Sequence, residues 1–217
     1  MGNIRVLLSL NLIQFLYYNF LCRRVKRDRG AYVLPYRHTR IEFHREALLI
    51  LHGNLCLNGN RYPGSRAECY LRLRSGARLE VNGCVQLFYH GTIEVHRGAE
   101  LKMGSCTVQS GAVLICAYRM TIGDGCLFSR MCCVSDSDHH RVMNREGEIT
   151  NYPRETVIGD NVWIGLKATV MKGAKIKSGS VIGANSVVGG RIRANAFVMN
   201  EPARVFSKIY WSHEGFG

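Results

Sequence analysis

Proline is scarce in this chain of 217 residues, which has four prolines against 23 glycines. So few prolines argue against long extended linkers. Acidic residues are also few, because 16 Asp and Glu stand against 29 Lys and Arg, a formal net charge of +13. The excess of positive charge favours an anionic partner. The basic residues are scattered and no recognised nucleic-acid module accompanies them, so nucleic acid is not the expected partner.

The nine cysteines form no CxxC pair and no zinc-ligand spacing, so no metal site is predicted. Their odd number, and an apolar N-terminus that lacks a small-residue cleavage site, indicate reduced thiols in a cytoplasmic protein. Cys132 and Cys133 are adjacent. We expect them to face alternately into and out of a wall rather than to act in catalysis.

Residues 158–200 repeat with a period of six, which is neither the helical period of 3.6 nor the strand period of 2. The aliphatic positions of the repeat are Ile158, Ile164, Val170, Ile176, Ile182, Val188 and Ala194, and four places after each stand Val162, Ala168, Ala174, Ser180, Ser186, Ile192 and Val198. Such a period requires a chain that turns a corner every six residues, with each aliphatic side chain in a shared interior. It predicts an all-β, parallel solenoid with triangular coils.

The phase extends upstream through Cys116, Ile122, Phe128 and Val134. Residues 135–157 keep the count, but they carry charges, paired histidines and a proline where the wall needs aliphatics. We therefore expect a loop extruded from one corner, the kind of place where binding and catalytic side chains concentrate. Looser Gly-Ala-x-aliphatic repeats between residues 72 and 126 predict earlier coils of the same solenoid.

The expected organisation is one domain over 31–203, with an N-terminal helix in 1–30 and a C-terminal helix or tail over 204–217. Residues 4–22 are largely apolar, and Arg23, Arg24, Lys26, Arg27 and Arg29 follow. Polar residues interrupt the apolar run, which argues against a membrane-spanning helix. Two alternatives stay open for it: a helix that caps the solenoid, or one that lies on the anionic inner surface of a membrane.

Several segments resemble one family. Residues 158–165, with the sequence IGDNVWIG, are similar to the signature of hexapeptide-repeat acyltransferases of the left-handed β-helix fold. Residues 134–140, 181–188 and 200–211 resemble the histidine loop, late coil and terminal motif of the sugar and polysaccharide O-acetyltransferase branch, which includes maltose and galactoside acetyltransferases. The resemblance implies a homotrimer with acetyl-CoA in the groove between neighbouring solenoids.

Acetyl transfer to a sugar hydroxyl needs a general base, and a neutral histidine suits this role near pH 7. The candidates are His139 and His140, and the register of the family's loop selects His140. Asp136 and Asp138 precede them. A carboxylate can orient the imidazole through a ring nitrogen, or it can shape the loop by accepting backbone amides; both alternatives stay open.

The resemblance also assigns binding residues. Trp163 precedes an inward Ile164, so it should point outward, beside the acceptor sugar or the pantetheine arm, or else into a trimer interface. Gln109 stands near the place of an acceptor-binding Asn in the family. The residues expected to meet acetyl-CoA are Gly165, Ala184, Gly189, Gly190, Arg204 and Lys208.

The sequence therefore favours an acetyl-CoA-dependent O-acetyltransferase that acts on a sugar of a capsule or lipopolysaccharide. Two alternatives remain. One is an amino-sugar N-acetyltransferase of the same fold, which depends less on a base because an amine is the better nucleophile. The other is a solenoid scaffold without catalysis, for which the Asp-x-Asp-x-His loop over residues 136–140 has no purpose.

Overall fold

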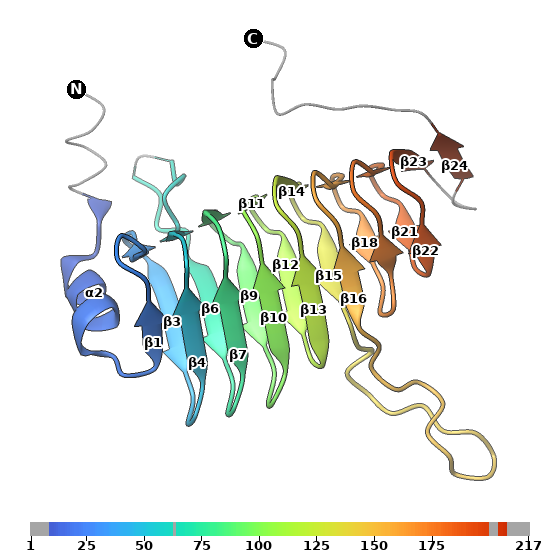
Figure 1. Ribbon diagram of the computed structural model, residues 1–217, viewed down its shortest axis with the longest axis horizontal. Coiled ribbons are helices and arrows are strands. Elements are labelled where there is room, and N and C mark those ends of the chain that lie inside the picture. Colours follow the sequence, from blue (N-terminus) through green and yellow to red (C-terminus); the bar gives the residue numbers. More distant parts are fainter. Residues whose placement is uncertain (1–8, 63, 200–203, 208–217) are drawn as a thin grey trace.

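The computed structural model describes residues 9–62, 64–199 and the backbone of residues 204–207. In this part, the chain winds into a solenoid with three walls, and each wall is a sheet of stacked strands (Figure 1). Successive strands pass from wall to wall, so from β4 to β23 each strand pairs in parallel with the strand three places earlier. The prediction of a triangular parallel solenoid is confirmed.

We name the walls sheets I, II and III in the order in which the chain visits them. Sheet I contains β1 Val25–Arg27, β4 Leu48–Leu51, β7 Arg78–Val81, β10 Glu100–Met103, β13 Arg119–Ile122, β16 Thr156–Ile158, β19 Lys175–Ile176 and β22 Arg191–Ile192. Sheet II contains β2 Val33–Pro35, β5 Leu55–Leu57, β8 Val85–Leu87, β11 Cys106–Val108, β14 Cys126–Phe128, β17 Trp163–Ile164, β20 Val181–Ile182, β23 Ala196–Met199 and β24 Arg204–Ser207. Sheet III contains β3 Thr39–Phe43, β6 Cys69–Leu73, β9 Thr92–Val95, β12 Val113–Cys116, β15 Cys133–Ser135, β18 Thr169–Val170 and β21 Val187–Val188.

The core is a set of aliphatic columns that run along the solenoid axis. Leu101 of β10 pairs in register with Leu79 on one side and Met120 on the other, and all three side chains are fully buried. The neighbouring Glu100 and Lys102 are partly exposed, as the period of two within a strand requires. Each coil therefore adds one more apolar layer to a shared interior.

The six-residue period places the side chains of the late coils as predicted, with one exception. The aliphatic residues from Ile158 to Val188 and the residues four places after them are buried. Ala194, expected inside, is exposed, and Ile192 takes the inward place. The reason is a short corner: Gly189 and Gly190 alone connect β21 to β22, so the last coil advances with fewer residues.

The N-terminal helical segment is shorter than predicted. Helix α2 Leu12–Leu16 continues into a single π-helical turn, η1 Tyr17–Leu21, and β1 already belongs to the solenoid, before the expected boundary at residue 30. The Arg27 guanidinium lies 5.1 Å from the centroid of the Phe20 ring and 4.7 Å from that of Tyr32, which holds this basic stretch against the first coil. Within the described residues, no helix is long and apolar enough to cross a bilayer.

The C-terminal helix or tail expected over residues 204–217 begins with a strand instead. Residues 204–207 form β24, which pairs antiparallel with β23 over Ala196–Met199. The backbone pairing covers the last edge of sheet II, which would otherwise present free amide and carbonyl groups. Residues 208–217 lie outside the described part of the chain.

A pair of alanine substitutions on β10 tests the inward and outward assignment. Leu101→Ala should lower the free energy of unfolding by about 2–5 kcal/mol, since it leaves a cavity in a fully buried column. Lys102→Ala, one residue later on the outer face, should change it by less than about 0.5 kcal/mol. Urea denaturation followed by circular dichroism measures both, and equal effects would contradict the register.

Candidate active site

A long loop, residues 136–155, leaves the solenoid at the corner between β15 of sheet III and β16 of sheet I (Figure 1). Its first residue, Asp136, is fully buried. The Asp136 carboxylate accepts the backbone amides of Ala117 at 2.6 Å and Tyr118 at 2.9 Å, and the Cys116 thiol donates to it at 3.3 Å. These three donors belong to the preceding coil, so Asp136 fixes the root of the loop to the wall.

A second anchor joins the two arms of the loop. Asp138 forms an ion pair with Lys172 and accepts a hydrogen bond from Asn151 Nδ2 at 2.9 Å. Lys172 also donates to the Asn151 carbonyl at 3.0 Å. The hydrogen bonds from Lys172 and Asn151 hold the pKa of the Asp138 carboxyl below its usual value. The outgoing arm, the returning arm and the next coil thus meet at one carboxylate.

His139 is held against the wall. Its backbone has a φ of 62°, in the left-handed region, and Ser137 Oγ accepts its amide at 3.0 Å. Its Nε2 lies 3.2 Å from Ser135 Oγ, and its ring centroid is 5.1 Å from that of His96. Burial lowers the pKa of His96. The His139 side chain is exposed, but its ring is held beside Ser135 and His96 at the base of the loop.

His140 differs from His139 because its backbone, and not its ring, is fixed. The His140 amide donates to the Asp138 carbonyl at 2.8 Å, and Asn151 Nδ2 donates to the His140 carbonyl at 2.8 Å. The side chain is exposed and borders a cleft of about 280 Å³, which His139, Arg141, Ile149, Tyr152 and Pro153 also line. Among the residues that the structure describes, the imidazole has no hydrogen-bond partner. A ring of this kind is available to take a proton from a bound molecule.

Asp136 and Asp138 were expected either to orient a histidine ring or to shape the loop, and their contacts are those of loop-shaping residues. Asp136 accepts backbone amides, and Asp138 binds a lysine and an asparagine side chain. In the described part of the chain, neither carboxylate is bonded to a histidine ring nitrogen. Both aspartates thus position the loop that carries His140.

Trp163 lies on another wall. It projects from β17 of sheet II with 38% of its surface exposed, and its Nε1 donates to Ser129 Oγ at 2.8 Å. The outward orientation expected from the repeat is confirmed. Ser129 follows β14, and Gln109, which is partly exposed, follows β11 at the same corner between sheets II and III. The indole is thus fixed beside a corner that Gln109 also borders.

The residues expected to meet acetyl-CoA divide between two corners. Gly165 and Ala184 follow β17 and β20, at the corner between sheets II and III. A Cβ atom on Gly165 would lie 2.6 Å from the Ile182 carbonyl oxygen, so the wall there can carry no side chain. Gly189 and Gly190 lie at the corner between sheets III and I. Arg204 begins β24, and Lys208 lies outside the described residues.

The predicted site residues therefore form two groups in one subunit. His139 and His140 extend from the corner between sheets III and I, whereas Trp163, Gln109 and Gly165 belong to sheet II and its corner with sheet III. In a triangular coil these are different corners, and a rigid wall separates them. A single chain does not bring all of the predicted residues to one cleft.

Sequence reasoning missed Lys172, Asn151 and Ser129. The repeat contained a signal for Lys172: Val134 pairs with Val170, so residue 172 lies directly beside residue 136, at the root of the loop. The same phase pairs Phe128 with Ile164, which brings Ser129 within reach of Trp163. Asn151 had no such signal, because it lies in the non-repeating loop.

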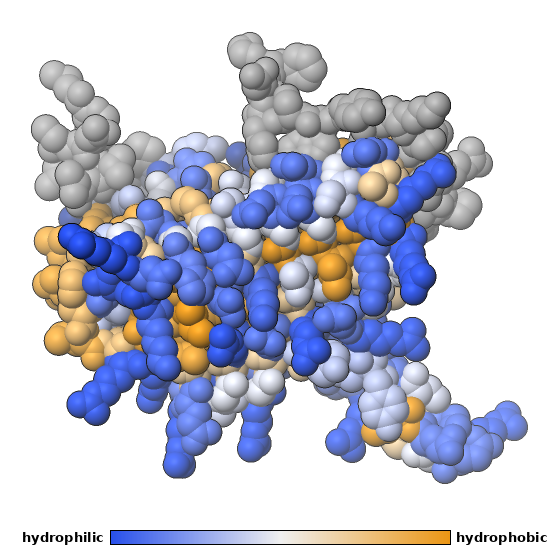
Figure 2. Space-filling model, in the orientation of Figure 1, coloured by the Kyte–Doolittle hydropathy of each residue, from blue (hydrophilic) through white to orange (hydrophobic). Residues whose placement is uncertain are grey.

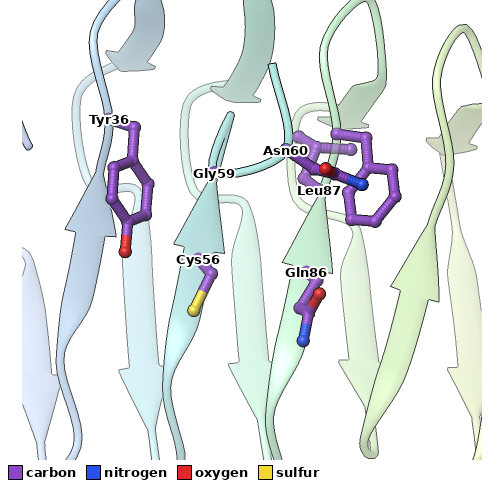
Figure 3. Close-up of a pocket in the computed structure, with 7 residues that line it drawn as sticks. Tyr36, Cys56, Gly59, Asn60, Gln86 and Leu87 are labelled. Atoms are coloured by element: carbon purple, nitrogen blue, oxygen red, sulfur yellow. The ribbon is translucent and has the colours of Figure 1, made fainter. Parts of the chain in front are cut away.

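Other reactive groups do not form a competing centre. Cys132 is fully buried, and burial raises the pKa of its thiol to about 12, so it is a packing residue. A cleft of about 300 Å³ lies on sheet II near the N-terminal end, where Cys56 and Gln86 project from β5 and β8 and Tyr36 follows β2 (Figure 3). Burial raises the pKa of Cys56 to about 12 as well. In the part of the chain described, no three His, Cys, Asp or Glu side chains gather as a metal site.

Comparison with known proteins begins with the repeat. Residues 155–190 match the family described as bacterial transferase hexapeptide (six repeats). The chain is 32% identical over 144 residues to a probable acetyltransferase of Mycobacterium tuberculosis, and this match covers 64% of this chain and 47% of that protein. It is 36% identical over 94 residues to the galactoside O-acetyltransferase of Escherichia coli, and this match covers 42% of this chain and 45% of that protein. The chain thus spans about half the length of these two relatives.

A third relative is matched over more of its length. This is a putative lipopolysaccharide biosynthesis O-acetyl transferase of Escherichia coli, 28% identical over 148 residues, covering 64% of this chain and 68% of that protein. Among solved structures, a polysialic acid O-acetyltransferase has a TM-score of 0.55 at 17% identity, covering 88% of this chain and 92% of that one. An N-acyltransferase from Bacillus cereus has a TM-score of 0.57 at 13% identity, and the match covers 92% of this chain and 89% of that one.

The structural likeness extends over nearly the whole chain and shows the fold, while the match to the family model covers residues 155–190. The expected fold, a left-handed parallel β-helix, is confirmed. Three parallel walls and six-residue steps agree with the hexapeptide-repeat match over residues 155–190. The chain therefore has the left-handed β-helix fold and carries hexapeptide repeats similar to those of bacterial acyltransferases.

Proposed function

We propose that this protein is an acetyl-CoA-dependent O-acetyltransferase that acylates a hydroxyl of a sugar in a surface polysaccharide. The observation that carries the proposal is His140, an exposed imidazole without a hydrogen-bond partner in the described chain, on a loop anchored at two carboxylates. The names of the galactoside and lipopolysaccharide relatives support a sugar acceptor. We assign Asp136 and Asp138 to holding the loop.

The reaction needs one base and one acyl donor. His140 takes the proton of the acceptor hydroxyl while the hydroxyl oxygen attacks the carbonyl carbon of the acetyl thioester. The carbon–sulfur bond then breaks, the acetyl ester remains on the sugar, and the coenzyme sulfur leaves and takes up a proton. The imidazole suits this transfer because its ordinary pKa lies near neutral pH. No covalent intermediate with the protein is required.

The division of the site between two corners supports an oligomer. We propose that the loop of one subunit faces the Trp163 side of its neighbour, in a homotrimer, and that acetyl-CoA lies in the groove between them. Gly165 gives that groove a wall of bare backbone, which a thin pantetheine chain requires. Trp163, with its indole fixed by Ser129, lies beside the same groove as a contact for the acceptor.

We also propose that the enzyme works in the cytoplasm, on the inner face of the membrane. Helix α2 and η1 cap the first coil: Tyr18 donates to the Ile41 carbonyl at 3.2 Å, and the buried Asn19 donates to the Val33 carbonyl at 2.8 Å. The opposite face of this cap exposes Leu12, Ile13, Leu16, Phe20 and Leu21. Figure 2 shows apolar side chains gathered at this end, with strongly hydrophilic ones beside them.

Exposed cations follow the apolar cap directly. Arg23, Arg24, Lys26 and Arg29 are all exposed. An apolar helix face next to a cluster of cations is the arrangement by which interfacial helices bind anionic lipid. Capping and membrane contact, the two alternatives left open by the sequence, thus use opposite faces of one segment.

Replacing His140 tests the proposed base. His140→Ala should lower kcat/KM by roughly 10²–10⁴-fold, since a positioned general base contributes this much. His139→Ala should lower it much less, and His44→Ala, on a distant and partly exposed histidine, should leave it unchanged. Thiol release from acetyl-CoA, measured with a panel of sugars and amino sugars, gives the rates. If His140→Ala acetylates an acceptor hydroxyl at nearly the wild-type rate, the assignment of His140 as the base is wrong. If the wild type acetylates only amino groups, the protein is an N-acetyltransferase instead.

Vesicle binding tests the proposed location. The full chain should co-sediment with vesicles of phosphatidylglycerol and phosphatidylcholine, and Ile13→Ser with Phe20→Ser should weaken this roughly tenfold or more, because large apolar side chains lose burial in the bilayer interface. Val142→Ser, on an equally exposed apolar residue of the loop, is the matched control. If the wild type stays in the supernatant, or if the control weakens binding equally, the cap does not bind lipid.

A further inference from the structure

Sheet I changes its charge along the solenoid axis. On its earlier strands the cations are paired: Arg78 lies 3.1 Å from Glu80 and 3.4 Å from Glu100, and Lys102 lies 3.6 Å from Glu100. The later strands β13, β16, β19 and β22 contain no carboxylate, although Glu155 and Asp160 flank β16 at its two ends. The strands of this wall are therefore charge-balanced at one end and carry only cations at the other.

The cationic end has four basic residues, Lys175, Lys177, Arg191 and Arg193, which we call the basic stripe. All four are exposed, and none forms an ion pair or a hydrogen bond through its side chain within the described residues. With Ile192 they line a cleft of about 400 Å³. Figure 2 shows strongly hydrophilic side chains over β22 at this end of the molecule.

The spacing within the stripe is set by the sheet. Lys175 of β19 pairs in register with Arg191 of β22, and strands in a sheet lie about 4.8 Å apart. Lys177 and Arg193 follow directly after the ends of these two strands, two residues beyond Lys175 and Arg191. Four like charges at such distances repel one another, so the arrangement is unfavourable unless anions lie across it.

The stripe begins where the loop ends. Lys172, which binds Asp138, precedes β19 at the same corner, and the Gly173 amide donates to the Arg154 carbonyl at 3.2 Å. The returning arm of the loop thus rests on the corner from which β19 starts. A chain-like molecule that lies on the stripe is directed toward the loop that carries His140.

From this we infer that the basic stripe binds the acidic groups of the acceptor, so that the acceptor is an anionic glycan rather than a neutral sugar. The inference rests on the proposed acetyltransferase function. Four cations on two strands exceed what one phosphate or carboxylate needs, which favours a ligand with repeated charges. The stripe residues include no aromatic side chain on which a base could stack, so an acidic glycan fits better than single-stranded nucleic acid.

Binding is measured directly with two oligosaccharides of equal length, polysialic acid as the anionic probe and dextran as the neutral one. At low salt, isothermal titration of the full chain should give a dissociation constant at least about tenfold lower for polysialic acid than for dextran. The affinity should fall as salt rises, since each bound anion releases a counterion. Lys175→Glu and Arg191→Glu should each weaken polysialic acid binding about five- to tenfold and flatten the salt dependence.

The control is Arg45→Glu, which reverses an equally exposed arginine at the corner between β3 and β4, in an early coil. It should leave binding unchanged, and unchanged circular dichroism spectra establish that all three variants are folded. Equal affinity for polysialic acid and dextran would overturn the inference. So would a higher KM for acetyl-CoA in the stripe variants with polysialic acid binding intact, which would assign the stripe to the cofactor phosphates, or tighter binding of an oligonucleotide than of polysialic acid.

His140→Ala separates this inference from the proposed function. The variant should bind polysialic acid as the wild type does while losing acetyl transfer. If wild-type protein binds the acidic glycan but releases no thiol from acetyl-CoA with any acceptor, the proposed activity fails and the binding surface stands. If transfer proceeds but prefers neutral sugars over charged ones, the stripe inference fails alone.

Discussion

The stacking of one buried aliphatic residue on the next, coil after coil, is the constraint on which the rest of this structure depends. Parallel pairing in register places Leu79, Leu101 and Met120 in one column, and similar columns run along every wall. Because each coil must return to the same register, every corner lies directly over the corner before it. Any side chain that the solenoid presents thus keeps a fixed position relative to those on the neighbouring coils.

This constraint explains how an exposed loop can carry an ordered histidine. Residues 136–155 have no repeat of their own, but the root at Asp136 binds amides of the coil below and Asp138 binds Lys172 of the coil above. Both anchors exploit side chains and amides that the stacked corners place in reach. The two aspartates and Asn151 form hydrogen bonds within the loop and its root, whereas the His140 imidazole has no such bond among the described residues, which is why we propose it as the base. The His139 ring lies beside Ser135 and His96 at the base of the loop.

Much of the wall was predictable from the sequence, since the period of six determines which residues face inward. The burial of Ile158 through Val188 and the exposure of Trp163 follow from it. The prediction for Ala194 was wrong because only two glycines form the corner before the last coil, which is two residues shorter than the repeat. A count in steps of six cannot detect such a shortened corner. The first strand, β1, was not predicted because it lies in a basic stretch of the sequence. Arginine and lysine can still occupy such a strand, since their long apolar stems pack against the wall while their charges stay in water.

The candidate site was predictable residue by residue but not as an arrangement. Sequence motifs indicated His140, Trp163 and Gly165, and the structure places the histidine on a different corner from the other two. The Asp138–Lys172 contact joins residues far apart in sequence through adjacent coils, so it requires the register as well as the motif. Because the cross-section is triangular, the proposed function brings the two corners together between subunits.

Mixed oligomers test that central claim most directly. His140→Ala and Trp163→Ala chains, each carrying a different tag, are co-expressed and the doubly tagged assemblies are isolated. If each site joins the loop of one subunit to the groove of its neighbour, every mixed cyclic trimer contains one intact site of three, and about a third of the wild-type rate should return. Mixed assemblies no more active than the two parent variants would show that both residues act within one chain, and the account of a shared site would be wrong.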